Sequence, residues 1–398
     1  MPVWHERTRA LREAGDLVVI GITSEQHADR ARLFAQWHGI DWPILWDPFN
    51  LTGSSAVPNI TGIDEHGLVR VVRPKPESFA EAFLAPTFAP PADAAVRPWL
   101  LTPASLAGPG DEGAVNALAW FLGVPWAASF DSTALEAAME RRLAALASAV
   151  AVDGADPAWA FRLGVARRMR LDSPVARAGD LGAAVEAWSR ALRADPHQYV
   201  WRRRLQQFGP RLDKPYNFYG WIERARAAIT ERGEEPLEVS IELCASESTE
   251  QGPLTFTDAG AQPDPTGAIP RDEGVLVDVD AAVVRHTRVV EGRLDLPTDV
   301  RVHVSLRPAR GVHWTNDAGP ALIWIDPPVG WRAERRLFTL AAPASETSGE
   351  LRAVDFELSP RPGVLLGEEL GGYALVYVCG PADGPCRFVR CEFTARCQ

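Results

Sequence analysis

Apolar and polar positions over the first 85 residues follow helical and strand periods in turn. Val3–Ala14 carries apolar residues at helical spacing, and Gly15 follows as a stop signal. Leu17–Thr23 is a continuous apolar run rich in β-branched residues, which is typical of a buried parallel strand. The pattern then predicts a helix, a short strand, a hairpin and a last short helix: Asp29–His38, Ile44–Trp46, Asn59–Asp64 with Leu68–Val72, and Phe79–Leu84.

The middle of the chain, residues 114–232, is predicted to form an all-helical domain. Ala114–Leu122 and Thr133–Val150 are amphipathic, and Asp131 or Ser132 is placed to cap the second helix. Two further helical stretches follow, WAFRLGVARRMR and GDLGAAVEAWSRALRADP. The preceding residues 86–113 are rich in Pro, Ala and Gly, which predicts a semi-extended linker.

Residues 236–398 are predicted to be all-β. Strand-like runs alternate apolar and polar positions, and turn-rich segments separate them. Seven runs at this spacing indicate a sandwich of two sheets: 237–243, 274–286, 300–306, 321–327, 351–358, 373–379 and 387–395. The chain is therefore expected to be a multidomain protein with an α/β part, an all-α part and an all-β part.

Composition excludes several classes of function. The net charge of −11 argues against a general nucleic-acid-binding surface. No apolar run is long enough for a transmembrane helix, and the charged, amphipathic start MPVWHERTRALREAG is unlike a signal peptide. Phosphate-binding loops, dinucleotide motifs and Gly-x-Ser-x-Gly are absent from the sequence, so nucleotide-dependent and serine-hydrolase mechanisms lack support and no cofactor is predicted.

Four of the five cysteines lie between Cys379 and Cys397, at the last predicted strand pair. Six residues separate Cys379 from Cys386, and a strand–loop–strand of this length can bring both Cα atoms into disulfide range. Three interpretations stay open: a reversible disulfide, a structural staple, or two reduced thiols. No basic residue or helix end is evident near Cys379 to lower its pKa, which counts against a fast nucleophile.

The other cysteines are expected to be inert. Cys391 shares the parity of Val389 and Phe393, which predicts a buried apolar thiol. Cys397 is expected to be mobile because it is one residue from the end, and Cys244 is expected in a core. The tail spacings do not match the paired Cys-x-x-Cys of zinc ribbons, and the eight histidines show no ligand spacing, so no metal site is predicted.

The segments VVIGIT (18–23), WPILWDP (42–48) and AVPNITGIDEHGLVRVV (56–72) resemble the thioredoxin-like family, in the branch of bacterial thiol-disulfide oxidoreductases and redoxins. The resemblance covers residues 1–85. It implies that Val57 and Pro58 form the cis X–Pro bond beside the substrate-binding face. It also implies a Cys-x-x-Cys ahead of Val3–Ala14, which is missing from this reading frame. The alternatives are a start upstream of Met1 and a catalytically inactive remnant.

Part of the helical domain resembles a tetratricopeptide repeat. The matching pattern is Trp159, Leu163-Gly164, Ala184, Trp188, Ala191-Leu192 and Pro196, with an insertion at Leu171–Gly179. One repeat is clear, whereas a stable array needs at least about three. The prediction is therefore a small helical domain with one repeat-like pair.

The carboxy-terminal part resembles the amino-terminal domain of the thiol:disulfide interchange protein DsbD. The matching segments are VRVHVSLRPARGVHWTN (300–316), WIDPPVGW (324–331) and YALVYVCGPADGPCRF (373–388). The resemblance implies an immunoglobulin-like domain in which Cys379 and Cys386 exchange disulfides with redox partners. Cys379 would form the mixed disulfide and Cys386 would resolve it. His313 and Trp314 would be placed to cover the disulfide, although a packing role for the histidine is the alternative.

The segment 198–221 mixes arginine with aromatic residues, including Trp201, Arg202, Arg203, Arg204 and Arg211. One interpretation is a surface that binds a protein partner or an anionic ligand, because arginine pairs with carboxylates and phosphates and aromatic residues anchor interfaces. The other interpretation, which the acidic overall charge favours, is packing between domains.

Together these patterns predict a thioredoxin-like thiol-disulfide oxidoreductase of the redoxin type with a protein thiol or disulfide as partner. The alternative is a non-catalytic scaffold that binds a protein partner through its helical domain and uses its cysteines structurally. The compartment stays open between cytoplasm and periplasm.

Overall fold

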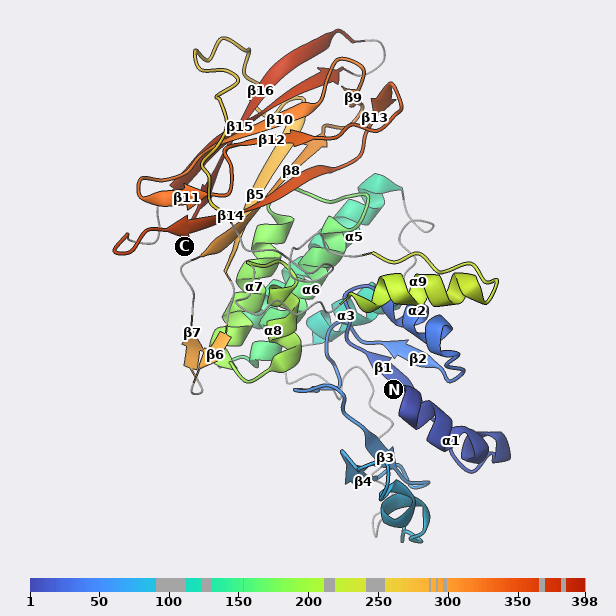
Figure 1. Ribbon diagram of the computed structural model, residues 1–398. Coiled ribbons are helices and arrows are strands. Elements are labelled where there is room, and N and C mark those ends of the chain that lie inside the picture. The colour runs from blue at the N-terminus through green and yellow to red at the C-terminus, as the bar shows by residue number, and fades with distance from the viewer. Residues whose placement is uncertain are drawn as a thin grey trace. The chain divides into compact units, whose positions relative to one another are not determined.

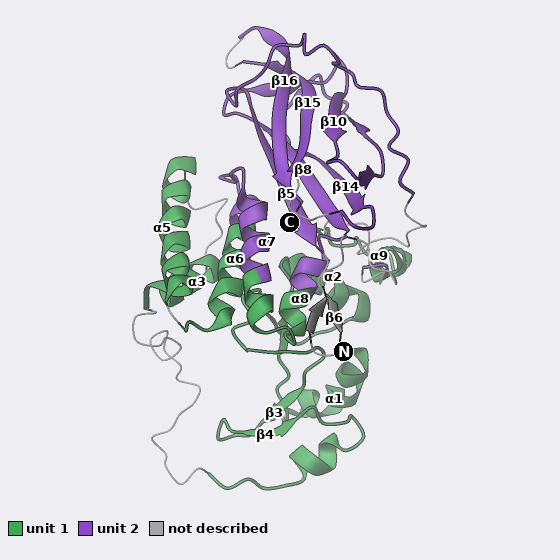
Figure 2. Ribbon diagram, turned by 90° about the vertical axis from the view of Figure 1, so that its left-hand side faces the viewer, with its two compact units in different colours: residues 1–169, 190–202, 221–241 green, residues 170–189, 203–220, 242–398 purple. Residues whose placement is uncertain are grey.

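The computed structural model describes residues 1–90, 112–123, 131–152, 154–210, 219–240, 255–285, 288–290, 293–295, 299–364, 369–380 and 384–397 (Figure 1). The chain forms two compact units, which Figure 2 colours separately. Unit 1 comprises residues 1–169, 190–202 and 221–241, and unit 2 comprises residues 170–189, 203–220 and 242–398. Each unit is described by itself below.

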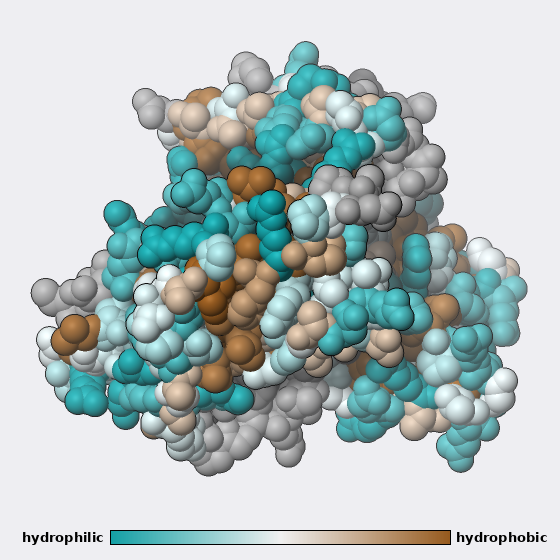
Figure 3. All heavy atoms as spheres, turned by 90° about the horizontal axis from the view of Figure 1, so that it is seen from above, coloured by the Kyte–Doolittle hydropathy of each residue, from teal (hydrophilic) through white to brown (hydrophobic). Residues whose placement is uncertain are grey.

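Within the described ranges, no helix has both the length and the apolar character needed to cross a membrane. Large apolar side chains that are exposed, such as Val275 and Val329, are scattered along the chain. In the view of Figure 3, apolar residues reach the surface in small groups bordered by hydrophilic ones.

Unit 1 begins with a helix, a strand, a helix and a strand, as the sequence pattern predicts. These are α1 (Pro2–Ala14), β1 (Gly21–Thr23), α2 (Ala28–His38) and β2 (Ile44–Trp46). β1 pairs with β2 in parallel, with Gly21 opposite Ile44. The predicted strand over residues 17–23 is paired only at its last three residues, and Val18 and Ile20 are exposed. The prediction of a buried strand over this whole run is therefore wrong, since Gly21 is its one buried residue and only Gly21–Thr23 are paired.

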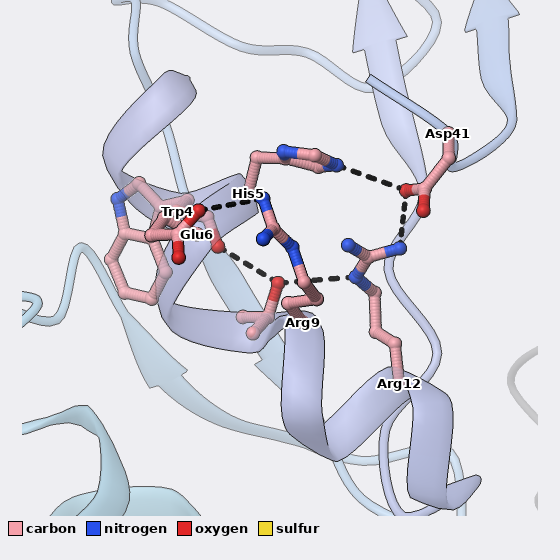
Figure 4. A network of polar contacts seen from close by, with 7 residues as sticks. Trp4, His5, Glu6, Arg9, Arg12 and Asp41 are labelled. Atoms are coloured by element: carbon pink, nitrogen blue, oxygen red, sulfur yellow. Dashed lines mark hydrogen bonds and ion pairs between the residues drawn. The ribbon is translucent and has the colours of Figure 1, made fainter. Parts of the chain in front are cut away.

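A polar network connects α1 to the loop before β2 (Figure 4). Nε2 of His5 lies 3.1 Å from Oδ1 of Asp41, and the guanidinium of Arg12 donates to the same oxygen. The hydroxyl of Thr8 donates to the carbonyl of Trp4 at 2.8 Å and accepts from Nε of Arg12 at 3.3 Å. Since His5 and Thr8 are the buried residues of α1, polar contacts hold this helix in place together with its apolar stripe.

A hairpin and a short helix follow, as predicted. β3 (Thr61–Ile63) and β4 (Val69–Val72) are antiparallel, and the π-helix η1 (Ala80–Leu84) comes after them. Asp64 closes the turn, because its carboxylate accepts from the N–H groups of His66 at 2.9 Å and Leu68 at 2.8 Å. This turn places β4 beside β3 with local hydrogen bonds alone.

The helical region contains α3 (Glu112–Gly123), α5 (Ser132–Ala151), α6 (Pro157–Leu171), α7 (Asp180–Ala194), α8 (Tyr199–Gln206) and α9 (Trp221–Glu231). Asp131 caps α5, since its carboxylate accepts from the N–H of Ala134 at 2.8 Å. Trp159 and Trp188, both expected between paired helices, are buried. Most of the predicted linker, residues 86–113, lies outside the described residues.

In unit 1, α9 and the extended residues after it run along α2. The ring of Trp221 stacks on Trp37, with centroids 6.0 Å apart. The N–H of Ser240 donates to Asp29 at 2.7 Å, and its carbonyl accepts from Nε of Arg30 at 2.8 Å. The strand predicted over 237–243 is therefore wrong for 237–240, because this backbone bonds to side chains of α2 rather than to a neighbouring strand. Residues 241–243 lie outside the described part.

Two antiparallel sheets form most of unit 2. The four-stranded sheet has the order β11-β14-β8-β5, and the six-stranded sheet has the order β12-β10-β15-β9-β13 with β16 paired to β15. A separate hairpin is formed by β6 (Arg288–Val290) and β7 (Arg293–Asp295). The other strands are β5 (Val277–Arg285), β8 (Val300–Pro308), β9 (His313–Thr315), β10 (Ala321–Asp326), β11 (Trp331–Ala333), β12 (Leu337–Leu340), β13 (Thr347–Ser348), β14 (Arg352–Pro360), β15 (Glu369–Cys379) and β16 (Cys386–Arg396).

Both sheets contribute to one apolar core. It includes Val302 and Phe356 from the four-stranded sheet and Ile323, Val376 and Phe393 from the six-stranded sheet. The predicted strands from residue 274 onward coincide with β5, β8, β10, β14, β15 and β16, because each alternates between this core and the opposite face. The short strands β9, β11, β12 and β13 are additional. The expectation of an antiparallel sheet region at the carboxy terminus is confirmed.

The outer face of the six-stranded sheet carries a smaller cluster under residues 255–272. Trp324, Tyr373 and Leu375 are buried there. The guanidinium of Arg390 lies over the ring of Tyr373 at 3.7 Å and pairs with the carboxylate of Asp264 at 3.0 Å. Cation–π and ionic contacts thus hold the 255–272 segment on this face.

Candidate functional site

A disulfide joins Cys379, the last residue of β15, to Cys386, the first residue of β16. The two residues are directly opposite in the antiparallel ladder, and their Cα atoms are 3.9 Å apart. The hairpin predicted from the sequence is therefore closed by the pair that the sequence singled out. Of the three interpretations left open, a reversible disulfide and a structural staple both fit this state.

The two cysteines differ in exposure. Cys379 is only 5% exposed, because β15 is flanked there by β9 on one side and β16 on the other. Cys386 is exposed and lies on β16, whose one partner strand among the described residues is β15. The disulfide therefore joins a shielded residue, Cys379, to an exposed one, Cys386.

Thr315 gives the shielded sulfur a polar partner. Its Oγ1 lies 2.8 Å from Sγ of Cys379. The hydroxyl is the donor, because a disulfide sulfur carries no hydrogen. The same donor would stabilise a thiolate on Cys379. Sequence reasoning did not identify Thr315; its one signal was its place in the segment 300–316, for which a resemblance was expected.

Aromatic residues adjoin the disulfide on the outer face. Tyr377 and Phe388 are opposite each other two positions along the ladder, and their rings stack with centroids 4.2 Å apart. His313 is opposite Cys379 on β9. Trp314 is fully buried in the core instead, where its indole N–H donates to the carbonyl of Glu350 at 2.8 Å. Trp314 therefore does not cover the disulfide.

Cys391 and Cys397 face the core and belong to its apolar cluster. Burial raises the pKa of Cys391 to about 12 and that of Cys397 to about 11, so neither is a thiolate near neutral pH. The prediction of a buried thiol at Cys391 is confirmed. The prediction of a mobile Cys397 is wrong, because its side chain packs in the core at 0% exposure. Cys244 lies outside the described residues.

In the described parts of the chain, no group of three or more His, Cys, Asp or Glu side chains is arranged to hold a metal ion.

The peptide bond between Val57 and Pro58 is cis, as the resemblance implied. Both residues are exposed, in the loop that precedes β3. They belong to unit 1, whereas Cys379 and Cys386 belong to unit 2. The two sets of predicted site residues thus lie in separately described parts of the molecule.

The arginine-rich segment has mixed exposure. Trp201 is 5% exposed and stacks on Phe161 with centroids 5.4 Å apart, and Arg204 is 3% exposed. Arg202 and Arg203 are half-buried; Arg202 lies over the ring of Tyr199 at 5.6 Å. A partner would therefore not reach Trp201 or Arg204 directly, because both are packed. Arg211 lies outside the described residues.

No protein-family model matches this chain, and no curated protein matches its sequence.

Proposed function

We propose that this chain carries out thiol–disulfide exchange with a protein partner through Cys379 and Cys386. In this proposal unit 2 contains an immunoglobulin-like domain of the type found at the amino terminus of DsbD. Residues 1–85 are an incomplete thioredoxin-like domain, and α6 and α7 are a tetratricopeptide-like pair. The observation that carries the proposal is the inequality of the two sulfurs. Cys386 is an exposed residue, whereas Cys379 is buried and its sulfur is hydrogen-bonded to Thr315.

The exchange runs in two displacements. A partner thiolate attacks Sγ of Cys386, and the Cys379–Cys386 bond breaks with its electron pair passing to Sγ of Cys379. A second partner thiolate then attacks the partner sulfur of the mixed disulfide and releases Cys386. The partner leaves with a disulfide, two electrons have passed to this chain, and the two protons lost by the partner's thiols are balanced by protonation of both cysteines. The reverse sequence oxidises a dithiol to the disulfide here.

This order is the reverse of the one expected from the sequence, which assigned the first attack to Cys379. The exposure of Cys386 and the shielding of Cys379 favour the new order. The hydroxyl of Thr315 supports it too, because a donor assists the sulfur that departs as a thiolate.

In this proposal, unit 1 binds the substrate. The cis bond at Val57-Pro58, the parallel pair β1–β2 and the hairpin β3–β4 support this assignment, because each was expected from the resemblance to the thioredoxin-like family. No cysteine precedes Cys244 in the sequence, so residues 1–85 have no thiol of their own. We therefore assign Val57 and Pro58 to contact with a substrate rather than to electron transfer.

The competing proposal is a non-catalytic scaffold in which the disulfide staples β15 to β16. The direct opposition of Cys379 and Cys386 in the ladder favours it, since a staple needs no more than this. The two proposals differ in one property. A redox pair is reduced while the domain stays folded, whereas a staple resists reduction until the domain unfolds.

Redox titration of the full chain in glutathione buffers separates the two. Free thiols are alkylated and located by peptide mass spectrometry, and near-UV circular dichroism follows the fold. We expect Cys379 and Cys386 to gain label together, at one midpoint, with a native spectrum. Cys391 and Cys397 serve as internal controls that stay unlabelled. If Cys379 and Cys386 gain label only where the spectrum shows unfolding, the disulfide is a staple and the exchange proposal is wrong.

A further inference from the structure

The edge of the six-stranded sheet beside Cys386 is partly open. β16 pairs with β15 on one side only. On its other side, Arg390 donates its N–H to the carbonyl of Pro270 and accepts from the N–H of Asp272, both at 2.8 Å. Both main-chain groups of Arg390 therefore point away from β15, and a passing segment of the chain occupies them.

The geometry of the strand determines where the main-chain groups of the neighbouring residues of β16 point. In an antiparallel ladder every second residue directs both its N–H and its C=O away from the partner strand. Phe388 and Cys386 have the same parity as Arg390, so their main-chain groups point to the same edge. Among the residues that the structure describes, none hydrogen-bonds to Phe388 or Cys386 on that side. Open edge groups of this kind are a template for another strand.

A cavity runs along this edge. Its volume is about 650 Å³, and it lies between residues 270–276 and Arg387–Val389, beginning one residue beyond Cys386. The carboxylate of Asp272 in its wall is already bonded to the N–H groups of Leu276 and Val277. The other charged residues in its wall include both signs, Arg271 and Arg387 with Glu273. This cavity is therefore suited to bind a ligand through main-chain hydrogen bonds rather than through net charge.

The position of the disulfide determines which side chain a segment bound at this edge must have. The Cys379–Cys386 bond joins β15 to β16, and the open edge is the side of β16 away from β15. Displacement at sulfur runs in line with the bond that breaks. A strand added at this edge would place a residue opposite Cys386 with its side chain on the same face, at a Cβ–Cβ distance of about 5 Å. A cysteine at that position would be within reach of Sγ of Cys386.

We propose that the open edge of β16 at Cys386–Phe388 docks an extended, cysteine-bearing segment of the redox partner as an added strand. This rests on the proposed exchange function and names what the site recognises. Main-chain groups hold the segment in the cavity, and register sets its cysteine in line with the Cys379–Cys386 bond.

The test uses the full chain and two synthetic probes. One is a nine-residue peptide of alternating Val and Thr with a single central cysteine. The other has the same sequence but is N-methylated at every residue, the cysteine included, so it cannot donate main-chain hydrogen bonds. Glutathione serves as a thiol reference. Formation of the mixed disulfide with Cys386 is followed by mass spectrometry after acid quenching.

Two matched variants locate the docking edge. Val275→Trp fills the cavity, and Val275 is 71% exposed, so a larger side chain there does not disturb the core. Val329→Trp makes the same substitution at another exposed valine of unit 2, 95% exposed and absent from the cavity wall. Circular dichroism checks that both variants are folded.

We expect the unmodified peptide to react about tenfold faster than its N-methylated form, the gain that main-chain pairing supplies. Val275→Trp should remove this difference and leave the glutathione rate unchanged, and Val329→Trp should leave all three rates unchanged. Equal rates for the two peptides in the unsubstituted chain would overturn the docking proposal and leave exchange intact. A native pair that glutathione cannot reduce would overturn the exchange function and docking with it.

Discussion

The hydroxyl of Thr315 lies 2.8 Å from Sγ of Cys379, although 64 positions separate the two residues. The pairing of β9 with β15 brings them together, and the pairing of β15 with β16 places Cys386 on the other side of Cys379. The donor, the shielded sulfur and the exposed sulfur of Cys386 therefore lie across three neighbouring strands. Among the described residues, a hydroxyl donor contacts the sulfur of Cys379 and none contacts that of Cys386, so the two ends of the disulfide are chemically unequal.

Thr315→Val removes this donor and keeps the side-chain volume. We expect the pKa of the Cys379 thiol in the reduced chain to rise and reduction by glutathione to slow by about three- to tenfold, because the departing thiolate loses a hydrogen bond. Stopped-flow reduction and the pH dependence of thiol alkylation measure the two effects. Thr394→Val, at an exposed position of β16, is the matched control. An unchanged rate and pKa would remove Thr315 from the mechanism.

Single serine variants test the order of attack. Cys379→Ser leaves the exposed Cys386 as a free thiol, and Cys386→Ser leaves the shielded Cys379. We expect Cys386 in the first variant to react with oxidised glutathione at least about tenfold faster than Cys379 in the second, because access limits disulfide exchange. The rate of glutathionylation, read by intact mass, decides this. Equal rates, or a faster Cys379, would restore the order first expected from the sequence.

The buried thiols should be silent in the folded chain. With pKa values of about 12 for Cys391 and about 11 for Cys397, we expect no alkylation of either at pH 8 until denaturant unfolds unit 2. Peptide mass spectrometry assigns the label to each cysteine. Labelling of Cys391 at the rate of a small thiol under native conditions would contradict its burial.

The same raised pKa values predict a loss of stability in alkali. The folded-state pKa of each thiol lies above the unfolded value of about 8.5, so the contribution is complete below that pH and is lost as the pH rises toward the folded pKa. We expect the urea midpoint of unit 2 to fall above about pH 9. Cys391→Ala should make that fall shallower, whereas an unchanged slope would exclude Cys391 as its source.

Asp355 predicts a loss of stability in acid. Burial alone would raise its pKa, but the charges and hydrogen bonds of His303 and Arg301 outweigh burial and hold the pKa below its ordinary value. Nδ1 of His303 lies 2.7 Å from Oδ1 of Asp355. Because the folded pKa is depressed, the carboxylate stabilises the fold above the unfolded pKa of about 3.9, and this contribution is lost as the pH falls through the folded value.

Asp355→Asn should therefore destabilise unit 2 at pH 7 by about 3 kcal/mol, the typical cost of removing one partner of a buried ion pair. The difference from the unsubstituted chain should shrink below about pH 4. Urea unfolding at both pH values measures it. Asp278→Asn, at an exposed position of β5, is the control and should change stability little. A deficit of equal size at both pH values would mean that the charge of Asp355 does not contribute.

The local sequence pattern was sufficient to predict a strand where its residues alternate between the core and the opposite face. β15 and β16 were predicted within a few residues, and the burial of Cys391 followed from its parity with Val389 and Phe393. The turn at Asp64 was likewise local, because its hydrogen bonds span only a few residues.

Features that depend on distant partners could not be predicted in this way. Residues 237–240 have a strand pattern, yet side chains of α2 some 200 positions away bind their backbone. Thr315 gained its role only through the neighbour that β9 acquires in the sheet. Cys397, expected to be mobile so near the end of the chain, is held by core residues from other strands. In each case tertiary contacts decide what a short window of sequence leaves open.

Side chains along β16 alternate between two faces, so the two cysteines of this strand lie in different environments. Cys386 faces outward with Phe388, whereas Cys391 faces the core with Val389 and Phe393. Inserting or deleting a single residue between Cys386 and Cys391 would exchange these faces for one of the two cysteines. It would either bury the reactive sulfur or expose an oxidisable one. The environments of the two cysteines therefore depend on whether their spacing is odd or even as well as on which residues the strand contains.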